Sequence, residues 1–373
     1  MSSSEKKRTE CALTVAGSDS GGGAGISADI RTFSALGVHP LVAITSVTAQ
    51  NTKEVKSVFE VPPEALRAQL EAIFEDFHVS AAKTGMLFSS ELIEVAAGFF
   101  RKQKIPLVID PVLRATTGAE LLREEGLRAL KEELIPLSSL ITPNIPEAEV
   151  LSGVKIRGVE DMKKSAEIIC RELGAGAVLI KGGHLSGDPS DLLYFNESFR
   201  IFHSSRLSGC SHGTGCTLSA GITALLARGF ELEEAVRRAR EFTRISIFHG
   251  SRVGSGECPV NPVAWLEIPA ERWRIFEEIL NSEELLRKKF PEGLSVVAKL
   301  PGFFSEDFLE VRFSRGGISV SLNSEIARKV LSDAGTSFAI ILDSEKASGD
   351  LEKRFRRFSD QHLIYFFNSF REL

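Results

Sequence analysis

Short apolar runs alternate with amphipathic stretches along the first two thirds of the chain. Residues 12–15 are apolar and lead into a glycine-rich turn at 16–23, after which Ile26, Ile30 and Phe33 recur at helical spacing. This order of strand, turn and helix is the opening half of a βαβ unit. The same alternation then continues. The predicted strands are 41–47, 81–84, 107–109 and 177–180, and the predicted helices are 63–74, 91–101, 162–173, 217–226 and 231–248.

The predicted strands end in corners that are polar or contain glycine. Ligands of open parallel sheets bind outside the carboxyl ends of the strands, so we expect these corners to converge on one site. The segments 192–195 and 199–203 predict a hairpin at the sheet edge. The pattern therefore indicates an α/β fold with a mostly parallel sheet. The corners are 83–86, 110–112, 142–144 and 181–184.

The character of the sequence changes after residue 250. Residues 250–262 contain several Gly and Pro and predict a loop or linker. We predict a disordered tail at 1–10, an α/β domain at 11–267 and a small α+β domain at 268–373. The last domain is expected to contain helices at 270–288, 325–332 and 351–358, strands at 294–300, 308–313, 318–322 and 338–342, and a hairpin turn at 315–317.

Composition narrows the class of protein. The chain has 373 residues, 43% of them hydrophobic and 25% charged, with a net charge of −5, which argues against a general nucleic-acid binder. No apolar run is long enough to span a bilayer, and the polar start resembles neither a signal peptide nor an anchor. The five cysteines are too few and too scattered for a disulfide framework. We therefore expect no membrane partner and a reducing, cytoplasmic location.

The loop at 210–216 carries the strongest chemical signal. Small and flexible residues leave its backbone N–H groups unshielded, and a predicted helix follows directly. Such a helix start is an anion cradle, and a phosphate is the guest it suits; the alternative is an ordinary tight turn. At the helix start the dipole is expected to lower the pKa of the Cys216 thiol and make the thiolate available as a base or nucleophile. The alternative is a buried, inert cysteine.

Other polar residues allow a functional and a structural interpretation. Asn144 and Glu147 lie three residues apart at a predicted helix start, where they can orient the hydration shell of Mg²⁺ or simply cap the helix. Asp29 is either a site residue or a first-turn acid, and Gln50 is either a site residue or a polar strand end. The serine-protease-like segment 18–22 lacks a preceding His, and Cys210, His212 and Cys216 match no standard zinc spacing. We therefore reject a protease and a structural zinc site.

The ordered set of motifs resembles the hydroxymethylpyrimidine kinase/phosphomethylpyrimidine kinase family of thiamine biosynthesis, within the ribokinase-like superfamily. The resemblance covers about residues 11–266. The motifs are 12–26, 32–37, Ala49-Gln50-Asn51-Thr52, Lys83-Thr84-Gly85-Met86-Leu87, Ile141-Thr142-Pro143-Asn144-Ile145-Pro146-Glu147-Ala148, Lys181-Gly182-Gly183-His184 and His212-Gly213-Thr214-Gly215-Cys216.

This resemblance implies a sheet flanked by helices, with ATP and Mg²⁺ bound at the strand ends. It further implies phosphorylation of 4-amino-5-hydroxymethyl-2-methylpyrimidine, then of its monophosphate to the diphosphate. A homodimer is also implied. The pyrimidine is expected near Gly17, Asp29, Gln50, Met86 and Val112. In keeping with this, Gln50 can offer a donor and an acceptor to an aminopyrimidine edge, while Met86 and Val112 can cover its faces.

The same resemblance assigns roles around the phosphates. The loop Gly213-Thr214-Gly215-Cys216 is expected to be the anion hole, with Cys216 where sugar kinases of the superfamily carry an aspartate base. Asn144 and Glu147 are expected to organise Mg²⁺ and phosphates, and Lys181 to lie near the nucleotide phosphates. One departure is that 115–118 reads Ala-Thr-Thr-Gly where the family usually has Ala-Lys-Ser-Gly. That puts the second phosphorylation in question, because a phosphate-contacting Lys is absent.

Several alternatives stay open at this point. The last hundred residues faintly resemble the start of a thiamine-phosphate synthase domain, and our hypothesis is a shortened, non-catalytic or regulatory relative. A pyridoxine or pyridoxal kinase is the nearest alternative activity. A pyrimidine-sensing regulator is a second alternative. A Cys-His hydrolase built on Cys216 and His212 lacks an evident orienting third residue.

Overall fold

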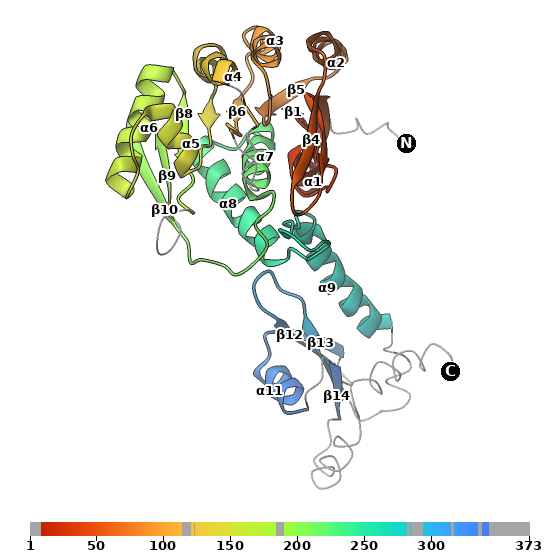
Figure 1. Ribbon diagram of the computed structural model, residues 1–373. Helices are drawn as coiled ribbons and strands as arrows, with labels where there is room; N and C mark the ends of the chain where they lie inside the picture. The colour runs from red at the N-terminus through yellow and green to blue at the C-terminus, as the bar shows by residue number, and fades with distance from the viewer. Residues whose placement is uncertain are drawn as a thin grey trace. The chain divides into compact units, whose positions relative to one another are not determined.

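The computed structural model describes residues 9–113, 121–122, 124–183, 190–281, 284, 294–314, 317–334 and 338–342. Most of the predicted tail, the departure at 115–118, His184, residues 315–316 and the predicted helix at 351–358 lie outside these residues. The chain divides into two compact units, Met1–Ala264 and Trp265–Leu373 (Figure 1). The boundary expected from the sequence was 267/268.

The first unit is built on an eight-stranded, mostly parallel sheet with the order β10-β9-β8-β7-β6-β5-β1-β2. The six strands from β8 to β2 run parallel, and β9 and β10 add an antiparallel hairpin at the edge. This edge hairpin was predicted from the sequence. The strands are β1 (Cys11–Ala16), β2 (His39–Ile44), β5 (Val79–Thr84), β6 (Leu107–Ile109), β7 (Leu140–Ile141), β8 (Ala177–Ile180), β9 (Ser190–Phe195) and β10 (Ser198–His203).

Helices cover both faces of this sheet (Figure 1). The larger core lies under α2 (Pro63–Asp76), α3 (Ser90–Phe100), α4 (Glu124–Ala129), α5 (Ile145–Ser152) and α6 (Val159–Leu173). On the other face α7 (Thr214–Ala227) packs between α1 (Gly25–Ala35) and α8 (Leu232–Phe248) and touches β1, β5 and β6. In β1, Leu13 and Val15 enter the larger core while Thr14 bonds to α1, as the alternation of a strand requires. A short π-helical turn, Leu130–Leu134, and a 3₁₀ turn, Ile135–Leu137, follow α4.

The single strand predicted at 41–47 was wrong. β2 ends at Ile44, and β3 (Ser46–Gln50) leaves the main sheet to pair with β4 (Val55–Glu60) in a separate two-stranded sheet. Thr45 lies at the break, where its backbone N–H bonds to Ala16 and its hydroxyl donates to the carbonyl of Met86 over 2.6 Å. These bonds hold the chain at the end of the main sheet, so β3 starts in a new direction.

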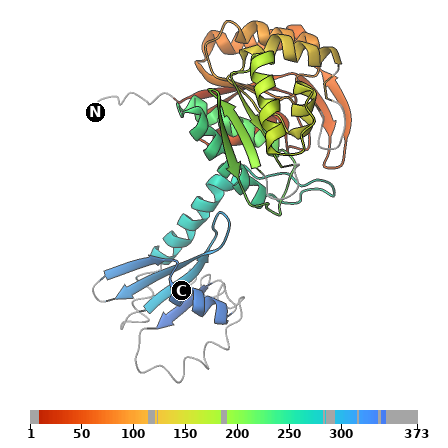
Figure 2. The ribbon, with the colours of Figure 1, turned by 90° about the vertical axis from the view of Figure 1, so that its left-hand side faces the viewer.

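The second unit contains a four-stranded antiparallel sheet with the order β13-β12-β11-β14. The strands of this unit are drawn in blue in Figure 2. One face carries a small core with Ile279 of α9, and the other packs against Ala327 and Leu331 of α11. The predicted helix start at 270 was late, because α9 begins at Ala264 and accommodates Pro269. The elements are α9 (Ala264–Asn281), β11 (Leu294–Leu300), β12 (Asp307–Ser314), β13 (Gly317–Leu322), α11 (Glu325–Ala334) and β14 (Phe338–Leu342).

Within the described residues, every helix is too short or too polar to cross a membrane.

Candidate functional site: two helix N-termini meet at the sheet edge

Two helices begin side by side at the carboxyl edge of the sheet, α1 at Gly25 and α7 at Thr214. The chain before α7 runs directly against the chain before α1: a Cβ on Gly213 would collide with the carbonyl oxygen of Gly23. Gly213 also has φ +86°, which favours glycine. Neither start is capped by a side chain of the described residues. The positive ends of two helices therefore point at one place, as an anion site requires.

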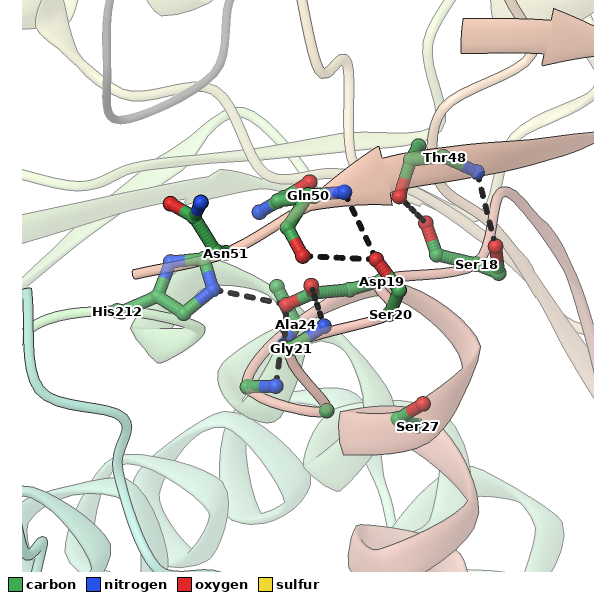
Figure 3. A network of polar contacts seen from close by, with 12 residues as sticks. Ser18, Asp19, Ser20, Gly21, Ala24, Ser27, Thr48, Gln50, Asn51 and His212 are labelled. Atoms are coloured by element: carbon green, nitrogen blue, oxygen red, sulfur yellow. Dashed lines mark hydrogen bonds and ion pairs between the residues drawn. The ribbon is translucent and has the colours of Figure 1, made fainter. Parts of the chain in front are cut away.

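Asp19 joins the two loops that precede these helices. Its carboxylate accepts hydrogen bonds from the backbone N–H groups of Gly21, Gly23 and Ala24 and from Nε2 of His212, over 2.8–3.0 Å. In Figure 3 the His212 ring points at Asp19 from the opposite loop. Burial works to raise the pKa of Asp19, but His212 and the N–H groups of Gly21 and Ala24 outweigh it and lower that pKa. Asp19 is therefore a charged tie between the glycine turn and the loop at 210–216.

The loop at 210–216 is fixed from its other side by the segment around Cys258. Cys210 and Cys258 form a disulfide, with their Cα atoms 4.9 Å apart. His212 also pairs through its backbone with Cys258 and Val260. The sequence expectation of cysteines without a disulfide framework did not foresee this bond, because the two residues are 48 positions apart and meet only when α8 folds back. The presence of this disulfide does not support the reducing compartment that we expected from cysteine usage.

Cys216 lies in the first turn of α7, where the N–H of Gly25 is directed at its thiol. The residue keeps some exposed surface, yet protein surrounds the sulfur closely. Burial raises the pKa of the Cys216 thiol to about 11, although Lys83 opposes the shift. The expectation that the helix dipole lowers this pKa was therefore wrong, because removal of the thiolate from water costs more than the dipole returns.

Lys181 brings a positive charge to the start of α7. It follows β8, and its amine binds Asp110 Oδ1 over 3.0 Å. Asp110 directly follows β6 and also accepts hydrogen bonds from the hydroxyls of Thr142 and Ser219. A Cβ on Gly215 would lie 3.4 Å from the Lys181 amine, so the first turn of α7 passes directly beside it. The structure thus brings Lys181 beside residues 213–216.

Asn144 and Glu147 form a reciprocal cap at the start of α5. Glu147 N–H donates to Asn144 Oδ1 over 2.9 Å, and Asn144 N–H donates to Glu147 Oε2 over 2.8 Å. Asn144 also pairs with Lys181 as a backbone bridge, which places this cap beside the amine. Burial raises the pKa of Glu147 to about 7, and nearby Asp110 adds to the rise while Lys181 opposes it. The structural interpretation from the sequence, a helix cap, is correct. The cap leaves the buried Glu147 carboxylate with too little positive charge around it to offset its burial.

The structure places the residues expected to hold the pyrimidine in different surroundings. Gly17 and Met86 lie against each other. Gln50 ends β3 above the glycine turn, where its backbone bonds to Ser20 (Figure 3). Asp29 lies beneath them, fully buried, with Oδ1 on the Lys83 amine and Oδ2 on the Thr14 hydroxyl. Val112 lines a small hollow with Gly85 and Asp110.

A profile of the phosphomethylpyrimidine kinase family matches residues 19–261, which is more than half of the chain. The chain belongs to the phosphomethylpyrimidine kinase family. The hydroxymethylpyrimidine/phosphomethylpyrimidine kinase of Bacillus subtilis is 46% identical over 263 residues, 68% of this chain and 95% of that protein. Its counterpart from Aquifex aeolicus is 44% identical over 248 residues, 66% of this chain and 97% of that one. The thiamine biosynthesis bifunctional protein ThiED of Geobacter sulfurreducens is 45% identical over 263 residues, 70% of this chain and 54% of that protein. This chain thus spans about half the length of ThiED.

Solved structures of kinases share the fold. The phosphomethylpyrimidine kinase of Clostridium difficile is 43% identical with a TM-score of 0.57, covering 63% of this chain and 98% of that one. The pyridoxal kinase of Bacillus subtilis, in complex with ADP, is 38% identical with a TM-score of 0.64, covering 69% and 98%. The sequence predictions of a ribokinase-like sheet and of a phosphotransferase are confirmed.

In this member of the phosphomethylpyrimidine kinase family, sequence reasoning assigned no role to four buried or half-buried ionisable side chains. Lys83 is the second-last residue of a predicted strand and Asp110 directly follows another, and both lie in corners that we had marked, so the signal for them was present. Asp19 and His212 lie within motifs that carry the family resemblance, but no role in the kinase site was assigned to either. Their pairing across 193 residues leaves no trace in local sequence.

Proposed function

We propose that the first unit transfers the γ-phosphoryl group of ATP to the hydroxymethyl group of 4-amino-5-hydroxymethyl-2-methylpyrimidine, and then phosphorylates the monophosphate to the diphosphate. The proposal rests on one observation. The uncapped starts of α1 and α7 and the amine of Lys181 lie together around Cys216. Kinase relatives named for these substrates support it. A pyridoxal kinase of Staphylococcus aureus solved with AMP-PCP, 33% identical with a TM-score of 0.65, supports ATP as the donor.

Positioning and electrostatics supply the catalysis in this proposal. The N–H groups of Gly213, Thr214, Gly215 and Cys216 form the anion hole, although Thr214 N–H itself bonds to Ser211 within the turn. Lys181 neutralises charge on the nucleotide phosphates from the adjoining strand end. Gly17, Gln50, Met86 and Val112 hold the pyrimidine. Asp29 acts from beneath the site by holding Lys83.

Asn144 and Glu147 fit Mg²⁺ held through its waters. Both offer oxygen, the donor that Mg²⁺ prefers, and the buried Glu147 carboxylate has too little positive charge around it. Within the described residues no three Cys, His, Asp or Glu side chains gather into a metal cluster. Bound Mg²⁺ would offset charge on the phosphate oxygens.

Cys216 is the residue that we propose removes the proton from the substrate hydroxyl. A thiol with a pKa of about 11 is protonated at neutral pH, so Cys216 must lose its own proton before it accepts another. Lys83 lies close enough to favour the thiolate electrostatically. The base therefore forms rarely at neutral pH, and turnover depends on the pH of the medium.

An ATP-dependent phosphorylation assay on the pyrimidine and on its monophosphate, run in parallel, tests the function. We expect both the monophosphate and the diphosphate as products. Failure with both substrates would refute the proposal. Formation of the monophosphate alone would instead confine the activity to the first step, in line with Thr116 replacing the family's usual Lys.

The similarity to pyridoxal kinases favours a second candidate activity, phosphorylation of pyridoxal or pyridoxine. The same fold and helix starts serve either substrate. Competition between pyridoxal and the pyrimidine in an ATP-consumption assay separates the two. We expect the pyrimidine to be the preferred substrate.

The role of the C-terminal unit is a separate proposal. We propose a shortened, non-catalytic or regulatory relative of a thiamine-phosphate synthase domain, in a cytoplasmic homodimer. Incubation of the full chain with thiazole phosphate and pyrimidine diphosphate should give no thiamine phosphate. Product formation would show that this unit is catalytic, whereas pyrimidine binding without ATP turnover would favour a sensor.

A further inference from the structure

Ser46 opens β3 and is fully buried, with its hydroxyl lacking a hydrogen-bond partner among the described residues. Its backbone is well satisfied, because the carbonyl accepts from Ser18 N–H over 2.9 Å. A buried hydroxyl without a partner loses its bonds to water and gains nothing in return, which destabilises the fold. The structure thus keeps a hydroxyl at a position where a small apolar side chain would be more stable.

The Ser46 hydroxyl packs against the backbone of Gly17, in the space that a side chain at this position would need. A Cβ on Gly17 would lie 2.5 Å from Ser46 Oγ and would also collide with the ε-methyl of Met86. The hydroxyl and the methyl group therefore converge on one point, between two of the residues that we assign to the pyrimidine.

Met86 is fixed at its backbone and adaptable at its tip. Its carbonyl accepts the Thr45 hydroxyl over 2.6 Å, so the main chain is held. The side chain has three rotatable bonds and a soft thioether, so its methyl can turn aside at low cost. The methyl group cannot satisfy the hydroxyl beside it. A ring with nitrogen and amino groups at its edge can, since a serine hydroxyl both donates and accepts.

We propose that Ser46 is a substrate-binding residue, whose hydroxyl bonds to a heteroatom at the edge of the aminopyrimidine once the Met86 methyl group turns away. This inference rests on the proposed function. It explains the buried hydroxyl as a group prepared for ligand and unsatisfied without it. It also adds a second polar contact to the one assigned to Gln50, at the other end of β3.

Ser46→Ala tests the inference by steady-state kinetics with both substrates varied. A hydrogen bond between neutral groups corresponds to roughly a 2- to 10-fold change in affinity. We expect the KM for the pyrimidine to rise by that factor, with kcat within about twofold and the KM for ATP unchanged. Because the hydroxyl is unpartnered, the Tm of the variant should equal or exceed that of the parent.

Thr32→Val is the matched control. Thr32 is equally buried and its hydroxyl also lacks a partner among the described residues, but it lies within α1 and is not among the atoms nearest to a Cβ on Gly17. We expect it to leave both KM values unchanged. An unaltered pyrimidine KM in Ser46→Ala would overturn the inference, as would a lower Tm with both KM values raised, which indicates a structural role. A parent enzyme that does not phosphorylate the pyrimidine refutes the proposed function itself, whereas an active parent with a kinetically silent variant refutes the inference alone.

Discussion

Two ion pairs lie behind the anion cradle, and each joins residues from distant parts of the chain. Asp29 holds Lys83 over 2.8 Å with both side chains fully buried, and Asp110 holds Lys181 over 3.0 Å. Burial opposes the charge on Lys83, but Asp29, Cys216 and Asp110 together outweigh it and raise the pKa of its amine. The positive charge thus stays beneath Cys216, where it acts on the thiol.

Lys83→Met should lower the free energy of unfolding by about 3–5 kcal/mol, because it leaves the buried Asp29 carboxylate without its cation. Urea denaturation measures this change. Lys155→Met is the control, since Lys155 pairs with Glu149 while its side chain is 76% exposed, and such pairs contribute about 0–1 kcal/mol. Adding Asp29→Asn to Lys83→Met should recover part of the loss. If Lys83→Met and Lys155→Met lower the free energy of unfolding equally, the assignment of Lys83 as a buried, charged residue is contradicted.

Cys216 should react slowly with iodoacetamide at neutral pH. Burial raises the pKa of its thiol to about 11, so the reactive thiolate should grow about tenfold for each unit of pH up to roughly pH 10. Peptide-resolved mass spectrometry of the labelled protein follows the rate. A plateau near pH 7 would show a thiolate formed at neutrality.

Cys216→Ala should lower kcat by about 10² if the thiol is the base.

The site could be predicted from the sequence only where local pattern carries it. Cys216, Asn144 and Glu147 stand at helix starts, where the consequences of position are general, and the structure places all three there. The direction of the Cys216 pKa could not be predicted, because it depends on how closely other segments enclose the sulfur. Ser46 was missed for a similar reason, since its lack of a partner is a property of packing.

At the scale of elements, the two loops before α1 and α7 behave as one unit. Asp19 supplies the acceptor for three N–H groups of the first loop and for His212 of the second. The loops pack so closely at Gly23 and Gly213 that a side chain cannot be added between them. Asp19 is therefore one of the groups that fix the geometry of the cradle, beside the disulfide and the backbone contacts of the loop at 210–216.

Asp19→Asn should lower the free energy of unfolding at pH 7 by about 2–3 kcal/mol, because hydrogen bonds to a charged acceptor are lost. The pKa of Asp19 is lowered in the folded state, so its contribution is present above the unfolded pKa of about 3.9 and disappears as the pH falls through the folded value. Parent and variant should therefore converge in acid-range urea titrations. The exposed Glu64→Gln serves as the control and should change little. A difference that persists unchanged at pH 3 would contradict the charged tie.

The Cys210–Cys258 disulfide should stabilise the first unit. Reduction or Cys258→Ser is expected to cost about 2–4 kcal/mol, since the bond closes a long loop, and to raise the KM for ATP by loosening residues 210–216. Thermal unfolding with and without dithiothreitol measures the first effect. Cys170→Ser, which removes a free cysteine, should leave the response to reductant intact. A parent protein whose Tm is the same in both conditions would speak against the bond.

The elements of the parallel sheet were predictable because buried strands leave continuous apolar runs. β6 and β8 match their predicted bounds, for this reason. β4 was missed, since most of its residues are half-buried or exposed and its pattern gives no apolar run. The departure of β3 from the main sheet depends on bonds of Thr45 to Ala16 and Met86, which the sequence does not encode locally.

At the scale of the whole molecule, the two units have separate hydrophobic cores. We therefore expect two transitions in differential scanning calorimetry of the full chain. ATP with Mg²⁺ at about 100 times its Kd should raise the free energy of unfolding of the first unit, the kinase unit, by roughly 2.7 kcal/mol. The transition of the second unit should stay at the same temperature. A single transition that moves as a whole with nucleotide would show that the units unfold together.

The pairing of Asp19 with His212 spans 193 residues, so the cradle is among the most non-local features of the fold. Bringing two distant segments together costs chain entropy before their contacts stabilise the fold. Contacts between residues far apart in the sequence therefore form late in folding. A nascent chain that has not been synthesised as far as residue 216 contains the start of α1 but not the complete first turn of α7. Nucleotide binding is therefore withheld until nearly the whole kinase unit has been synthesised, and retention on an ATP resin separates completed chains from shorter ones.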